Sequence, residues 1–272
     1  MSEIEYKAIK YEVVAEHVAK LTFNRPDRLN AYTPTMCKEA VLALAEYQHD
    51  DNLRVLILTG AGRGFCSGGD VKGDVDEFIQ SRKKQMATFR RLQSAPQALN
   101  LALHRIEKPV IAMINGVAVS GGLSFAMMCD YRVAAESARL GDPSGRVGLL
   151  ADEGGCWIFP RLMGMDKALK MVWFNEIYDA REALALGMVS EVVPDAELES
   201  RAMALATRLA TRAPNSVAAD KLMMRRSSEL SLEASLGDAG IWAMWNNKQP
   251  DGQEGLAAFK EKREPKFTGA TL

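Results

Sequence analysis

The sequence predicts an α/β fold, because short apolar strands, glycine-rich loops and helices alternate along most of the chain. Two runs, Val55–Thr59 and Pro109–Ile114, are continuously apolar, as strands buried on both faces are. A glycine cluster and then a helical stretch follow each of them. From about residue 196 the pattern is helical almost throughout. We therefore expect an α/β core over residues 1–195 and a helical C-terminal region over 196–272, forming one structural unit.

The first elements are predicted from alternation and from turn residues. Tyr11–Val14 and Val18–Phe23 alternate as short strands do, and a loop follows at Asn24–Asp27. Thr33 and Pro34 offer an N-cap and a first-turn proline for a helix that runs to about Gln48.

The later elements repeat this scheme. A long polar helix is expected over roughly residues 75–105, between the two buried strands. An apolar helix is expected to begin near Leu123, and a third short strand at Tyr131–Ala134. Met127 and Met128 lie in that apolar helix, where core packing is their expected role.

Composition indicates an ordinary globular protein. The 272 residues are 47% hydrophobic and 25% charged, with a formal net charge of −1, so nothing in the total attracts nucleic acid or an anionic membrane. The N-terminal segment lacks signal-peptide features, and no apolar run is long enough to span a bilayer. The four cysteines form no CxxC pair, so we expect reduced thiols, no metal and a cytoplasmic location.

Two glycine clusters are candidates for catalysis. Phe65–Asp70 and Ser120–Gly122 each follow a predicted strand. Main-chain N–H groups at such loops and helix starts are free to meet negative charge, and two that converge form an oxyanion hole. The alternative is a pair of tight turns. A third cluster, Gly60–Gly64, has GxGxG spacing with Gln80 in place of an acid twenty residues on, which disfavours dinucleotide binding.

Several motifs together resemble the crotonase superfamily, the enoyl-CoA hydratase/isomerase family. They are Asn24-Arg25-Pro26 with Asn30-Ala31, FCSGGD at 65–70, KPVIAMINGVAVSGG at 108–122, AMMCDYRVA at 126–134, FPRLMG at 159–164 and EGLAAFKEKR at 254–263. The resemblance covers nearly the whole chain. It implies a spiral of ββα repeats, a helical C-terminal trimerisation region, and an acyl-CoA thioester as substrate, with no cofactor besides the coenzyme A of that substrate. It also implies a homotrimer or a dimer of trimers.

The resemblance assigns roles by position. The amides of Gly69 and Gly121 would hold the thioester oxygen. Asp70 and Lys72 resemble the segment beside the adenine of coenzyme A, and Lys260 and Lys262 resemble basic residues that reach its phosphates. Solvated charges on a helix face are the alternative for these two lysines.

The acids decide the reaction class. Where family hydratases have two glutamates, this chain has Ser124 and Ser144, and an unassisted hydroxyl is too weak an acid to replace either. Asp152, eight residues before Pro160, matches the lone carboxylate of family isomerases, which need one base to move a proton from C2 to C4. The alternative for Asp152 is a helix N-cap. Glu153 competes with it for the catalytic role.

Other readings stay open. Asp152 or Glu153 positioning water would give a hydratase; a thioester hydrolase and an inactive acyl-CoA-binding protein are further alternatives. Dehalogenation is disfavoured because Gln97 stands where a dehalogenase relative has histidine. Trp157 lines the acyl pocket or packs in the core. The three histidines, which lack triad partners, are expected to be structural: His17, His49 and His104.

Overall fold

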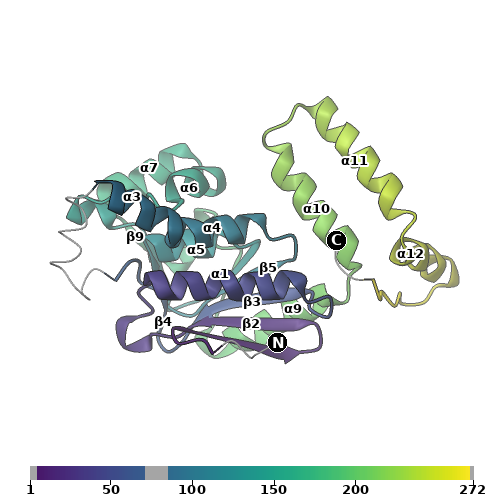
Figure 1. The fold of residues 1–272 in the computed structure, drawn as a ribbon, viewed down its shortest axis with the longest axis horizontal. Coiled ribbons are helices and arrows are strands. Elements are labelled where there is room, and N and C mark those ends of the chain that lie inside the picture. Colours follow the sequence, from purple (N-terminus) through teal and green to yellow (C-terminus); the bar gives the residue numbers. More distant parts are fainter. Residues whose placement is uncertain (1–4, 71–84, 270–272) are drawn as a thin grey trace.

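The order of the strands shows how the chain is wound. The computed structural model describes residues 5–70 and 85–269 (Figure 1). Its described strands form one sheet in the order β1-β2-β3-β5-β7-β10 and a smaller one in the order β4-β6-β8-β9. The strands are β1 (Ile9–Ala15), β2 (Val18–Phe23), β3 (Val55–Gly60), β4 (Gly64–Cys66), β5 (Val110–Ile114), β6 (Val117–Val119), β7 (Tyr131–Ala135), β8 (Arg139–Gly141), β9 (Ile177–Asp179) and β10 (Glu191–Val193).

Helices follow the strands on both sides of the large sheet. The α-helices are α1 (Pro34–His49), α3 (Gln85–Ser94), α4 (Pro96–Arg105), α5 (Gly121–Met128), α6 (Gly155–Met163), α7 (Met165–Phe174), α8 (Ala180–Ala185), α9 (Leu198–Ala210), α10 (Pro214–Ser227), α11 (Leu232–Asn246) and α12 (Pro250–Glu261). Short 3₁₀ helices are η1 (Pro26–Arg28), η2 (Ser144–Val147) and η3 (Asp195–Glu197).

Consecutive strands alternate between the two sheets. In the pairs β3–β4, β5–β6 and β7–β8, the first strand joins the large sheet and the second joins the small one. Equivalent strands of successive pairs run parallel to one another. Helices follow each pair, so the chain repeats a strand–strand–helix unit and advances by one strand in both sheets. The predicted spiral of ββα repeats is confirmed.

The first unit also agrees with the sequence prediction. β1 and β2 pair antiparallel, with Ile9 opposite Phe23. The Thr33 side chain accepts a hydrogen bond from the Met36 N–H at 3.2 Å, and Pro34 opens α1. Both N-terminal signals of this helix are therefore used as predicted.

The long helix predicted over residues 75–105 is wrong within the described residues. α3 ends at Ser94 and α4 begins at Pro96. Pro96 has no N–H to continue the ladder, and proline disfavours the helical conformation at the residue before it. Ala95 accordingly has φ −131° and ψ −92°. The part of the prediction over 75–84 lies outside the described residues.

The large sheet is covered on both faces because alternate strand residues point to opposite sides. On one side Leu56 and Leu58 belong to the main core with α1, α4 and α5. On the other side Val55 and Ile57 pack against α9. The α9 residues in this cluster include Ala202, Ala206 and Ala210, whose small side chains allow a close approach of helix to sheet.

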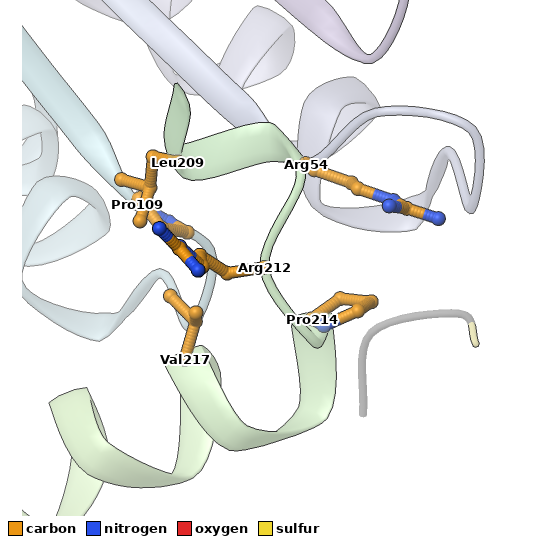
Figure 2. A pocket seen from close by; sticks show the side chains of 6 residues that line it. All are labelled: Arg54, Pro109, Leu209, Arg212, Pro214 and Val217. Carbon is orange, nitrogen blue, oxygen red and sulfur yellow. The ribbon is translucent and has the colours of Figure 1, made fainter. Parts of the chain in front are cut away.

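The C-terminal region divides into a helix on the core and helices that leave it. α9 packs on the sheet, whereas α10, α11 and α12 project away from it in Figure 1. The boundary predicted at residues 195/196 stays a prediction. At the junction, Arg54 donates to the carbonyl oxygens of Ala210 and Phe267, both at 3.0 Å. Figure 2 shows this junction, with Arg54, Pro214 and Val217 around a small pocket.

Asp130 ties α10 to the core. Its carboxylate accepts from Lys221 Nζ at 2.6 Å, from Arg225 Nη2 at 2.7 Å and from the Val110 main-chain N–H at 2.8 Å. Lys221 is almost enclosed, and burial lowers its pKa to about 8 against the opposing effect of Asp130. Two cations and one amide therefore converge on a single carboxylate at the root of the projecting helices.

The projecting helices expose large apolar side chains. These are Met224 on α10, four residues of α11 and two of α12: Leu232, Leu236, Ile241, Met244, Leu256 and Phe259. No residue of α11 is buried. Of the helices in residues 5–70 and 85–269, none combines the length and the apolar character that a bilayer crossing requires.

Replacing Asp130 by alanine is expected to destabilise the protein by about 3–5 kcal/mol, because it leaves the buried Lys221 ammonium without its counter-charge. Urea unfolding followed by circular dichroism measures this loss. Asp220→Ala is the control, since Asp220 is exposed on the same helix, and it is expected to change stability by less than about 0.5 kcal/mol. Equal losses in the two variants would contradict the anchoring role of Asp130.

Candidate functional site

The two glycine clusters predicted from the sequence meet in space. β4 and β6 are parallel neighbours, so the loops that leave their carboxyl ends lie side by side. A Cβ atom on Gly68 would lie 3.1 Å from Cβ of Ser120. Because β4 and β6 are the second strands of successive repeats, Gly69 and Gly121 occupy equivalent loops.

The Gly69 amide is directed by a one-residue bridge. Tyr32 pairs with Gly69 in parallel fashion: the Tyr32 N–H donates to the Gly68 carbonyl at 2.8 Å, and the Asp70 N–H donates to the Tyr32 carbonyl at 3.0 Å. These two hydrogen bonds use the carbonyl of Gly68 and the N–H of Asp70, so the N–H of Gly69 points away from Tyr32.

The Gly121 amide is free for a different reason. Gly121 is the first residue of α5, and the first N–H groups of a helix have no intrahelical acceptor. Ser120, just before it, has a φ of 52°, a conformation that side-chain-bearing residues adopt uncommonly. The loop thus turns sharply at Ser120 and presents the N-terminus of α5 beside Gly69.

Tyr32, which no sequence motif marks as a site residue, contacts both loops. Its hydroxyl oxygen would lie 3.2 Å from a Cβ on Gly69, and its Cε1 2.7 Å from a Cβ on Gly121. Its ring packs edge-on against Phe125 of α5, with centroids 5.4 Å apart. An aromatic residue after a loop is typical of core packing, so nothing in the sequence pattern marked it.

Glu153 brings a carboxylate to the same place. Its Oε1 accepts a hydrogen bond from the Tyr32 hydroxyl at 2.6 Å and would lie 3.0 Å from a Cβ on Gly121. Glu153 is 8% exposed, and its Oε2 is buried without a hydrogen-bond partner among the described residues. A side chain on Gly121 would collide with both partners, which explains the glycine at this position.

Burial changes the proton affinity of this carboxyl. The pKa of Glu153 is raised to about 7. Desolvation is the main cause and the nearby charges of Asp152 and Asp142 add to it, whereas hydrogen bonds from Tyr32 and from the main-chain N–H of Glu153 itself oppose it. A carboxyl with a pKa near neutrality both accepts and returns a proton at working pH, which is what a general base in reversible proton transfer needs.

The turn that carries Glu153 is held by α4. Gln97 Nε2 donates to the Asp152 carbonyl at 2.9 Å, and Asn100 Nδ2 donates to the Glu153 carbonyl at 2.5 Å. Gly154 then adopts φ +136°, which lets the chain reverse into α6. Gln97, which stands where a dehalogenase relative has histidine, therefore helps to hold the turn that carries Asp152 and Glu153.

Asp152 does not cap the following helix. The N-cap of α6 is Gly154, and no side chain caps that helix end. The N-cap alternative for Asp152 is thus wrong. Asp152 is partly buried and makes an interaction of its own. The carboxylate that contacts Tyr32 beside Gly121 is that of Glu153.

The two serines lie around the same loops. Ser124, one turn into α5 from Gly121, is fully buried, and its Oγ has no partner among the described residues. Ser144 Oγ donates to Ser120 Oγ at 3.0 Å, so the loop after β8 joins those after β4 and β6. Hydroxyls therefore occupy the positions at which the resemblance implies two glutamates.

Trp157 lies on α6, where its ring contacts two side chains. His104 packs edge-on against it with centroids 5.0 Å apart, and the Arg161 guanidinium lies 4.0 Å from the ring centroid. These contacts give Trp157 a packing role; its place in an acyl pocket stays a prediction.

The described residues expected to meet coenzyme A come from two different parts of the chain. The Asp70 carboxylate accepts from Arg25 Nη2 at 2.7 Å. Lys260 and Lys262 lie at the exposed end of α12, where Lys262 forms the C-cap. Lys72 lies outside the described residues.

The remaining reactive side chains have structural partners. His17 Nδ1 and His49 Nδ1 hydrogen-bond to main-chain carbonyls at 2.6 and 2.7 Å. All four cysteines are free, and three of them are buried. Within the described part of the chain, no group of three or more His, Cys, Asp and Glu side chains is arranged to hold a metal ion.

Comparison with known proteins finds relatives that match nearly the whole chain. The family profile described as Enoyl-CoA hydratase/isomerase matches residues 14–270. The chain is 34% identical to 1,2-epoxyphenylacetyl-CoA isomerase of Escherichia coli K12 over 95% of this chain and 99% of that protein. It is 35% identical to (E)-benzylidenesuccinyl-CoA hydratase of Thauera aromatica over 94% and 98%. The crystal structure of an enoyl-CoA hydratase from Bacillus anthracis superimposes with a TM-score of 0.89 at 31% identity, covering 97% of this chain and 100% of that one.

Gly121→Ala is expected to destabilise the protein by about 1–3 kcal/mol, because the new methyl group would displace the Tyr32 ring and the Glu153 carboxylate. Thermal and urea unfolding measure the loss. Gly240→Ala is the matched control: a Cβ there meets nothing within 4 Å, and alanine favours the α11 helix. A Gly121→Ala protein as stable as the wild type would show that the packing around Gly121 is loose.

Proposed function

The chain belongs to the enoyl-CoA hydratase/isomerase family, and we propose that it is an enoyl-CoA isomerase in which Glu153 is the catalytic base. The observation that carries the proposal is the buried Glu153 carboxylate beside Gly121, together with serines at the two positions where the resemblance implies the paired acids of a hydratase. Migration of a double bond needs one group that takes and returns a proton, and Glu153 meets that need.

The proposed reaction moves one proton within the substrate. Glu153 takes a proton from C2 of a 3-enoyl-CoA, and the electrons of the C2–H bond delocalise through the thioester as a dienolate. The same carboxyl returns the proton to C4, so the double bond moves from C3–C4 to C2–C3. Atoms and electrons balance without an external acid, oxidant or cofactor besides the coenzyme A of the substrate.

The oxyanion hole supplies most of the stabilisation. A proton at C2 of a thioester is too weakly acidic for a carboxylate unless the developing oxygen charge is stabilised as it forms. Two N–H donors, those of Gly69 and Gly121, are available for that oxygen. Each such donor contributes roughly 3–4 kcal/mol to the transition state.

Self-association belongs to the same proposal. The apolar side chains exposed along α10–α12 form a surface that solvent contact disfavours. We propose that copies of this chain cover it in a homotrimer or a dimer of trimers. Lys260 and Lys262 on α12 are the candidates for contact with the phosphates of coenzyme A in such an assembly.

Glu153→Gln is expected to lower isomerase activity by about 10²–10⁴-fold, the contribution of a positioned base, whereas Asp152→Asn keeps activity within about tenfold. Proton NMR in deuterated water with a 3-enoyl-CoA and a 2-enoyl-CoA measures double-bond migration and deuterium uptake at C2 and C4. Both variants alter one acid in the same turn, so each controls for the other.

Four results would contradict the proposal. A loss confined to Asp152→Asn would move the base to that residue. Rapid formation of 3-hydroxyacyl-CoA would make the protein a hydratase that uses these acids to position water. Release of free coenzyme A would indicate a thioester hydrolase. Binding of the thioester without exchange at C2 would indicate an acyl-CoA-binding protein.

The pH dependence of isomerisation follows from the pKa of Glu153. The base acts as a carboxylate, so kcat/KM is expected to be level above pH 7 and to fall about tenfold per unit below it, with a midpoint at about 7. Initial rates between pH 5 and 9 in a buffer of constant ionic strength measure this limb. A midpoint near 4.5, the ordinary value of glutamate, would contradict a buried base.

A further inference from the structure

Tyr32 makes the contacts of a residue that controls Glu153. Its hydroxyl donates to Glu153 Oε1 at 2.6 Å, a short distance typical of a hydrogen bond to a charged acceptor. The two residues are 121 positions apart in the sequence, so the contact is formed by the fold and not by a local turn. The other carboxylate oxygen, Oε2, has no partner among the described residues.

The fold fixes the position of Tyr32 from two sides. Its main chain is held by the bridge to residues 68–70, which is the same bridge that directs the Gly69 amide. Its ring is held by Phe125 and lies against Gly121. The hydroxyl therefore has little freedom, and it reaches the carboxylate from the oxyanion-hole side.

The two oxygens of Glu153 are consequently unequal. Oε1 already accepts the hydrogen bond from the Tyr32 hydroxyl, which makes it the weaker acceptor for the substrate proton. Oε2 keeps its full acceptor capacity, and burial without a partner makes it a costly atom to leave unsatisfied. A proton delivered from substrate carbon is better accepted there.

We propose that Tyr32 is the positioning residue of Glu153: its hydroxyl occupies Oε1, so that Oε2 is the oxygen that takes and returns the substrate proton. This inference rests on the proposed function and assigns within it the atom that acts. Tyr32 itself transfers no proton. Burial and the Glu153 charge raise the pKa of Tyr32 well above 10, so it stays a donor throughout the working range.

Several other titratable groups lie near the Glu153 carboxyl, and removal of the Tyr32 hydroxyl leaves all of them in place. They are Asp142 before η2, Asp152 on the same turn, Cys37 on α1, Cys66 on β4 and Cys156 on α6. Burial raises the pKa of each of these three thiols, so they remain neutral near pH 7. A change of the Glu153 titration on removal of the Tyr32 hydroxyl is then the effect of that hydrogen bond.

The test is Tyr32→Phe, which keeps the ring and deletes the hydroxyl. One hydrogen bond to a charged acceptor corresponds to about one to two pH units, so the acid limb of kcat/KM is expected to move upward from about 7 by that amount, with KM nearly unchanged. Tyr47→Phe is the matched control. It deletes a buried tyrosine hydroxyl that donates to the Pro109 carbonyl at 2.9 Å, and the limb is expected to stay near 7.

A second readout does not depend on turnover. Carbon-13 NMR of protein labelled at the glutamate carboxyl, with the Glu153 signal identified by its absence in Glu153→Gln, reports the titration in the free protein. The Glu153 pKa is expected to rise in Tyr32→Phe and not in Tyr47→Phe. If Tyr32→Phe does not fold, incorporation of 3-fluorotyrosine, a stronger donor, is expected to lower that pKa.

The outcomes separate the two proposals. An unchanged Glu153 titration and an unmoved limb in Tyr32→Phe, with activity still lost in Glu153→Gln, would overturn the role of Tyr32 alone. Full activity of Glu153→Gln would overturn the proposed base, and the NMR titration would still report whether Tyr32 controls the carboxyl.

Discussion

The structure around the site depends on one constraint, the burial of the Glu153 carboxyl between Tyr32 and the first residue of α5. A carboxylate removed from water is costly unless hydrogen bonds replace its hydration. Here one oxygen is compensated by the Tyr32 hydroxyl and the other is not. Desolvation, which the Tyr32 hydrogen bond offsets only in part, raises the pKa of Glu153 to about 7. The burial that costs stability thus also gives this carboxyl the proton affinity that the proposed base needs.

The repeated architecture brings the parts of this site together. Because the second strands of successive units are parallel neighbours in the small sheet, the loops after β4, β6 and β8 leave the same edge. Those loops carry Gly69, Gly121 and Ser144. Strand repetition places the two amides. The helix α4, which belongs to the unit of β3 and β4, holds the acidic turn through Gln97 and Asn100. The geometry of the candidate site thus comes from strands that share one edge, with short loops after them.

The sequence predicted what depends on local pattern. Buried strands, the Thr33–Pro34 helix start and the glycine clusters are all present, whereas the single helix over 75–105 is interrupted because proline at 96 outweighs the helical pattern. The spacing to Pro160 favours Asp152 as the catalytic acid. The orientation of the two adjacent acids, however, depends on the φ of Gly154 and on side chains of α4 some fifty residues earlier, which the spacing does not reveal. No sequence pattern marks Tyr32, because its contact with Glu153 joins residues that are far apart along the chain.

The decisive measurement is a crystal structure with a bound saturated acyl-CoA, which has no double bond to move. We expect the thioester oxygen about 2.7–3.1 Å from the amide nitrogens of Gly69 and Gly121, with C2 about 3–3.5 Å from Oε2 of Glu153. The proposal would be contradicted by C2 lying against the Asp152 carboxylate, or by a thioester oxygen bound away from those two amides.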